Sequence, residues 1–160
     1  MVNDAMLRWA DQPPEVRHVH IDRKDVQRFA IATRATDPIH HDPEYAATQG
    51  YRDVVAPLMF FVSLRTGAYN AVPQDQLHPE GTPLADIPPM EFTNAMAGET
   101  DADIHRPFVA GDDVRCERRV VGLDEKQGRR GTMTLARFEY VYSDNDAKPF
   151  VVERFTRLFL

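Results

Sequence analysis

The sequence predicts an α+β fold in which a curved antiparallel sheet wraps around one apolar helix. The first observation is the segment 54–69, whose consecutive apolar residues from Leu58 to Val62 leave no polar face. A helix that is apolar all round is surrounded by protein. The second is that residues 89–160 consist mostly of long strand patterns. Such a helix and such a sheet must bury each other, which gives an architecture of the hotdog type.

The N-terminal part is predicted to hold one strand and two short helices ahead of the apolar one. Residues 1–14 form an arm, in which Trp9 either docks on the body or lies at its surface. Alternation over 15–21 favours a strand, and helical spacing over 23–33 favours a helix capped by the preceding aspartate. A helix over 43–48 follows, since its proline suits a first turn.

The start of the apolar helix is predicted to leave backbone amides free. Pro57 suits its first turn. Ala56, just before it, offers no side-chain acceptor for the first N–H groups. The amides of Leu58 and Met59 are therefore open to another partner, such as a ligand.

The C-terminal half is predicted to be a loop followed by strands. Residues 71–89 are rich in proline, and this stretch is a lid, a cover for a partner or a plain surface insertion. Strands over 114–123 and 132–142 form a hairpin, and 150–160 form the last strand. One face of 132–142, or the apolar helix, is a candidate surface for a second copy. The 160 residues are the size of one domain, so 1–160 is taken as a single unit.

Composition excludes several classes of function. The net charge is −6 and no basic stripe occurs, which argues against nucleic acid. No apolar run approaches the length of a membrane span, and the acidic N-terminal residues do not resemble a signal peptide. Cys116 is the single cysteine, so no disulfide framework forms within one chain, as is usual in the cytoplasm.

A cluster of ionisable residues directly precedes the apolar segment. His40 is the preferred functional residue, because the unperturbed pKa of histidine lies near neutrality. Asp37, Asp42 and Glu44 are close enough in sequence to orient its ring or act as a base. Asp37 and Asp42 also fit turn and cap roles beside prolines, and for Asp42 we favour the cap. His41 is expected to face solvent.

Other site chemistries have weaker support. His18 and His20 share one strand face, but no zinc-ligand spacing is present, so no metal site is predicted. Ser63 lies within the apolar segment without the glycines of a nucleophile elbow. Cys116 is expected to be a buried, inert thiol on a strand.

These segments together resemble a known family, the MaoC-like hotdog hydratases and dehydratases, and within it the N-terminal-type, FAS1-like dehydratase half. The matching stretches are 33–46 with Gly50-Tyr51 and Val55-Ala56-Pro57, then 106–112, 128–131 and 153–156.

The resemblance implies reversible syn addition of water to a trans-2-enoyl thioester carried by CoA or acyl carrier protein. In this family an aspartate and a histidine hold one water molecule between them. A backbone amide at the start of the central helix binds the thioester oxygen as an enolate develops. The resemblance implies no metal or redox cofactor. It also implies a dimer of hotdog subunits, either identical or different.

The family pattern is incomplete here. His40 takes the catalytic histidine place and Asp37 an asparagine place, whereas Ala35 stands at the catalytic aspartate place. Either Asp37 substitutes for the missing aspartate, or the chain is the degenerate half of a pair whose partner is intact, or it only binds thioesters. Leu58, where many members have glycine, begins the predicted oxyanion-binding residues together with Ala56, Pro57 and Met59.

Two further expectations accompany this interpretation. The alternative enzyme is a hotdog acyl-CoA thioesterase, in which Glu44 or Asp42 would activate water. Arg52, Arg65 and Arg106 are candidate phosphate contacts for an anionic carrier, because the acidic chain as a whole would repel it.

Overall fold

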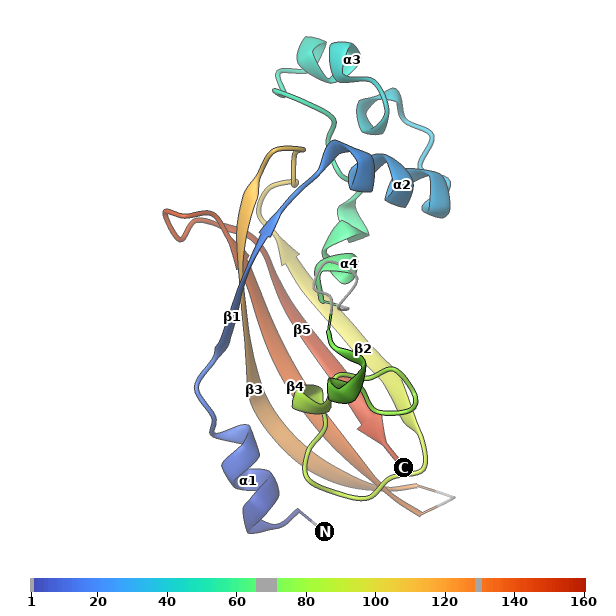
Figure 1. Ribbon diagram of the computed structural model, residues 1–160, viewed down its shortest axis with the longest axis vertical. Helices are drawn as coiled ribbons and strands as arrows, with labels where there is room; N and C mark the ends of the chain where they lie inside the picture. The colour runs from blue at the N-terminus through green and yellow to red at the C-terminus, as the bar shows by residue number, and fades with distance from the viewer. Residues whose placement is uncertain (1, 66–71, 129–130) are drawn as a thin grey trace.

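The computed structural model describes residues 2–65, 72–128 and 131–160, and these form an α+β hotdog fold (Figure 1). Its antiparallel sheet has five strands in the order β1-β3-β4-β5-β2. The strands are β1 (Glu15–His20), β2 (Ala95–Ile104), β3 (Asp113–Gly128), β4 (Gly131–Ser143) and β5 (Pro149–Phe159). The α-helices are α1 (Asp4–Ala10), α2 (Arg23–Thr33), α3 (Pro43–Thr48) and α4 (Phe61–Arg65). Short 3-10 turns are η1 (Pro38–His40), η2 (Leu58–Phe60), η3 (Gln74–Gln76) and η4 (Leu84–Asp86).

One face of β4 lines the core, with Thr134, Ala136, Phe138, Tyr140 and Tyr142 buried at alternate positions. Leu135 and Ser143, on the other face, are buried as well. Phe60, Phe61 and Leu64 of η2 and α4 are at most 1% exposed. The ring of Phe61 lies 6.2 Å from that of Tyr142, between centroids. The helix and the sheet therefore bury each other.

The start of the apolar segment differs from the prediction. Residues 54–57 are extended, with an isolated β-bridge between Val55 and Val109, and helical turns begin only at η2. The side chains of Leu58 and Met59 are 66% and 51% exposed. The prediction of a helix buried on all sides is wrong at this end, because backbone pairing competes with the helix there.

Three other predicted boundaries change. The N-terminal arm contains α1, whose Trp9 packs edge-on against Phe138 at 6.0 Å between ring centroids. The described part of the 71–89 loop contains η3 and η4. The hairpin strands β3 and β4 extend through the predicted polar connection to Gly128 and Gly131. Positions 66–69, 71 and 129–130 of the predicted helix, loop and hairpin lie outside the described residues.

β1 and β2 are the outermost strands of the sheet, and β1 pairs with β3 only over the first six residues of β3, from Asp113 to Arg118. β4 lies between β3 and β5, so the predicted association surface over 132–142 is a central strand with both edges paired. In Figure 1 the helices α2 and α3 and the turn η1 gather at one end of the sheet, beyond the start of α4. No helix in the described ranges is long and apolar enough to cross a bilayer.

Candidate active site

The polar loop is folded by its own side chains. Arg34 ends α2 in the left-handed conformation, with φ of 57°, and this reverses the chain. The Asp37 carboxylate then accepts the N–H of Ile39 at 3.0 Å and caps η1. Asp42 caps α3 as predicted, accepting N–H groups of the first turn at 2.8 and 3.2 Å. The X-Pro aspartates thus shape the loop.

The His40 ring is held by the extended strand before η2. Its Nδ1 lies 2.6 Å from the carbonyl oxygen of Val55. A carbonyl only accepts hydrogen bonds, so Nδ1 carries the proton. In the neutral ring, Nε2 then keeps its lone pair and is able to accept a proton or hold a water molecule.

A cavity of about 740 Å³ opens beside this ring. It is lined by Phe29, Thr33, His40, Tyr51, Val55, Ala56, Pro57, Leu58, Met59, Ile104, His105, Arg106 and Pro107. The walls combine the start of the central helix with the segment that follows β2. None of these lining residues is an aspartate or a glutamate.

The predicted oxyanion-binding residues line this cavity. Pro57 gives no side-chain cap to η2. Among the described residues, the N–H groups of Leu58 and Met59 have no hydrogen-bond acceptor. Free N–H groups at a helical start attract a partial negative charge. The structure therefore brings His40 and these amides to one cavity.

Asp37 and Ala35 do not supply a carboxylate there. Asp37 is exposed, caps η1 and is absent from the cavity wall. Ala35 has a methyl group in place of an acid, and its carbonyl lies 2.7 Å from Nε2 of His41. His41 is therefore half-buried and hydrogen-bonded, and the expectation that it faces solvent is wrong.

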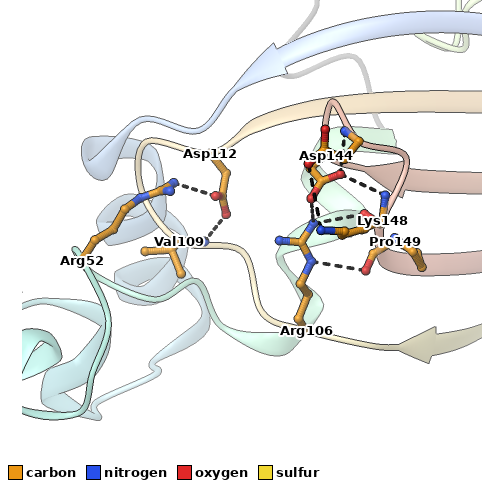
Figure 2. Close-up of polar contacts among 8 residues, drawn as sticks. Arg52, Arg106, Val109, Asp112, Asp144, Lys148 and Pro149 are labelled. Atoms are coloured by element: carbon orange, nitrogen blue, oxygen red, sulfur yellow. Dashed lines mark hydrogen bonds and ion pairs between the residues drawn. The ribbon is translucent and has the colours of Figure 1, made fainter.

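The three arginines considered as phosphate contacts each have a carboxylate partner, and Figure 2 shows the partners of Arg52 and Arg106. Arg52 bonds Asp112 at 2.6 Å and Arg106 bonds Asp144 at 2.7 Å. Arg65 forms a buried ion pair with Glu153. Their charges are thus largely neutralised within the protein, which weakens the phosphate interpretation.

Glu153 is a buried acid that the sequence reasoning missed. It has 0% exposure and accepts from the Tyr142 hydroxyl at 2.9 Å as well as from Arg65. Burial raises the pKa of Glu153, while Arg65 and Tyr142 act in the opposite sense. Its place on the apolar face of β5, between Val151 and Phe155, was the available signal.

The weaker candidates are not assembled into sites. Within residues 2–65, 72–128 and 131–160, no group of three or more histidine, cysteine, aspartate or glutamate side chains is placed to hold a metal ion. His20 instead pairs with Asp113 at 2.8 Å. Burial raises the pKa of the Cys116 thiol to about 12, which leaves it protonated and inert.

The sequence matches the FAS1-like, dehydratase domain region over residues 12–153. The chain belongs to this MaoC-like dehydratase family. A UPF0336 protein of Saccharopolyspora erythraea is 32% identical over 129 residues, covering 80% of this chain and 73% of that protein. A UPF0336 protein of Thermobifida fusca is 28% identical over 128 residues, covering 79% of this chain and 76% of that protein.

Solved structures of MaoC-like hotdog proteins share the fold of this FAS1-like dehydratase chain. The ChsH1-ChsH2 complex of Mycobacterium tuberculosis matches with a TM-score of 0.71 at 16% identity, covering 97% of this chain and 88% of that chain. The C-terminally truncated HadBC (3R-hydroxyacyl-ACP dehydratase) complex of the same organism has a TM-score of 0.63 at 18% identity, covering 92% and 97%. The R-hydratase PhaJ1 of Pseudomonas aeruginosa has a TM-score of 0.65 at 20% identity, covering 93% and 83%.

Proposed function

We propose that this chain is one subunit of an enoyl-thioester hydratase, equivalently a 3-hydroxyacyl-thioester dehydratase, and that it works with a second hotdog subunit. The observation that carries the proposal is the composition of the cavity. It contains an imidazole with a free nitrogen and unpaired amides, but none of the described residues that line it carries a carboxylate. The site is therefore suited to holding a thioester, yet it lacks one of the two acid–base groups of the family.

The reaction requires a water oxygen to add to C3 of the enoyl group and a proton to add to C2. Negative charge collects on the thioester oxygen as the new C–O bond forms. Amides placed like those of Leu58 and Met59 stabilise this charge most strongly in the transition state. An imidazole paired with a carboxylate holds the water and moves its proton. His40 alone supplies only half of that pair.

The missing carboxylate favours a division of labour between subunits. In the proposed complex, the partner contributes an intact aspartate–histidine pair, and this chain mainly shapes the acyl pocket. Leu58, Met59 and Ile104 expose apolar surface at the cavity, where a fatty acyl group or a partner would cover it. The substrate is an acyl thioester of CoA or of an acyl carrier protein.

A hotdog thioesterase is a less suitable alternative. Its water-activating carboxylate would be Glu44 or Asp42, but Asp42 caps α3 and neither residue lines the cavity. A purely thioester-binding partner subunit fits the same cavity. The two alternatives differ in product, since a thioesterase releases free CoA and a binding subunit releases none.

The test is an assay for hydration of a trans-2-enoyl-CoA, in which the reaction is monitored by the loss of absorbance of the enoyl group. We expect the purified chain alone to be inactive and the complex with a co-expressed neighbouring hotdog protein to be active. Ala35→Asp should give the isolated chain measurable activity, because it restores an acid at the family position. Ala35→Asn, of the same shape without the charge, is the matched control. Absence of hydration under every condition would remove the proposal.

A further inference from the structure

One internal segment fixes the wall of the cavity behind His40. Residues 106–112 run antiparallel to the extended residues 54–56, next to the Val55–Val109 bridge. Two backbone bonds join them, from Ala56 N–H to Phe108 O at 2.8 Å and from Ala110 N–H to Val54 O at 3.0 Å. These residues contribute buried side chains to the core. The carbonyl that holds His40 therefore belongs to a backbone whose position is set by 106–112.

Arg52 anchors the C-terminal end of the segment 106–112 (Figure 2). Its guanidinium donates to Asp112 at 2.6 Å and to the Ala110 carbonyl at 3.3 Å. The second oxygen of Asp112 accepts the N–H of Val109 at 2.7 Å. The Asp112 side chain is only 12% exposed, so this connection is partly shielded from water. Arg52 is thus connected through the Asp112 carboxylate to Val109, the residue that forms the bridge with Val55.

Arg106 anchors the N-terminal end of the segment 106–112 (Figure 2). It donates to Asp144 at 2.7 Å and to the Lys148 carbonyl at 3.0 Å. Its guanidinium carbon also lies 3.6 Å from the centre of the Phe150 ring, which is close enough for a cation–π contact. These groups occupy one face of the guanidinium and one of its terminal nitrogens. Since Arg106 lines the cavity, this anchor ties the cavity wall to the β4–β5 turn.

We propose that Arg52 and Arg106 are positioning residues, which set the orientation of His40 and of the helix-start amides through 106–112. Both guanidiniums are committed to acidic and carbonyl partners inside the protein, which argues against a primary role in binding a phosphate. The forked, planar guanidinium suits this task, since it bonds several oxygens in fixed directions. The functional importance of the orientation rests on the proposed function, but the orientation itself does not.

The test is ¹⁵N NMR of the imidazole nitrogens in the full chain. In the native protein, His40 should show a protonated Nδ1 and an unprotonated Nε2. Arg106→Met and Arg52→Met should raise the population of the Nε2–H tautomer several-fold, because the Val55 carbonyl is no longer held against Nδ1. Arg106→Lys and Arg52→Lys keep the charge and should lie between these variants and the native protein.

Arg119→Met is the matched control. Arg119 is also an exposed arginine with a carboxylate partner, Glu139, but it lies outside the cavity wall. Its removal should leave the His40 signals unchanged. The lysine variants keep the test decisive where a methionine variant fails to fold.

Titration with CoA separates the two roles. A positioning role predicts altered His40 signals with an unchanged Kd for CoA. Unchanged His40 signals in the folded arginine variants would overturn the proposal, and a weakened Kd alongside unchanged signals would make these arginines phosphate ligands. Loss of the proposed enzyme activity in every complex would leave the tautomer result intact, so the two proposals fail separately.

Discussion

Glu153 is a carboxylate with 0% exposure on a sheet face that is otherwise apolar. Its partners are Arg65, at the described end of α4, and the Tyr142 hydroxyl on β4. A buried pair pays a large desolvation penalty, so it adds little net stability compared with apolar residues. Loss of one partner is strongly destabilising, because an uncompensated charge then stays buried. The ion pair consequently fixes where α4 sits on the sheet.

We expect Glu153→Leu to destabilise the fold by about 3–5 kcal/mol, since the buried guanidinium of Arg65 then has no acceptor at this position. Denaturant unfolding measures this free energy. The double variant Arg65→Met with Glu153→Leu should recover most of the loss. Asp103→Asn removes an acid from the exposed pair with Arg154 and should change stability only slightly. An equal loss of stability in the Glu153 variant and in Asp103→Asn would show that the burial of Glu153 is unimportant.

The raised pKa of Glu153 also predicts a pH dependence. The folded state binds this proton more tightly than the unfolded chain does, so folding favours the protonated form. The contribution of Glu153 to the free energy of unfolding should therefore fall as pH rises from the ordinary glutamate pKa through the raised value. The measurement is unfolding across this range in the native protein and in Glu153→Gln. The difference between the two curves should have this sign, and the opposite sign would contradict it.

At the scale of elements, some local sequence patterns predicted the observed secondary structure and others did not. The helix over 23–33 and the helix over 43–48 appear with their predicted bounds. Amphipathic spacing determines the first locally, and a capping aspartate with a first-turn proline determines the second. The segment 54–57 does not, because its pairing with residues 108–110 is a long-range contact that no local pattern shows. The same pairing positions the His40 ring. The sequence therefore indicated His40 as a functional residue, but it did not predict the geometry around its ring.

Two aspartates test how much a cap contributes. Asp42 accepts two N–H groups at the start of α3, whereas Asp22 makes no side-chain bond at the start of α2. Asp42→Ala should cost about 1 kcal/mol of stability. Asp22→Ala should cost clearly less, since it removes only a favourable charge near the helix start. Thermal unfolding of both variants checks this, and equal losses would count against capping as the cause.

At the scale of the molecule, β2 is an outermost strand of the sheet with one free edge. Among the described strands it pairs with β5 alone, and it is largely exposed along its length. Its end leads directly to the cavity, through Ile104 and His105. An exposed strand of this length invites pairing with another strand. The fold class followed from the sequence because helix and sheet bury each other, but the location of this edge required the strand order.

The charges on this edge argue for an unlike partner. Asp101 and Asp103 are both exposed on β2 and share one arginine, Arg154. Two copies joined through β2 would bring these acids together across a two-fold axis, and facing like charges are destabilising. A partner whose edge strand is neutral or basic avoids this repulsion. The charge pattern is thus in line with a complex of two different hotdog subunits.

The variant Asp101→Asn with Asp103→Asn should therefore increase self-association of the isolated chain, measured by sedimentation velocity. High salt should shift the native protein in the same direction, because about 1 M salt reduces the screening length to about 3 Å. A control variant, Glu117→Gln with Glu139→Gln, removes the same charge from positions paired on both sides, Glu117 on β3 and Glu139 on β4, and should not promote dimers. If the native chain is already a stable homodimer at low salt, repulsion between these edges does not select the partner.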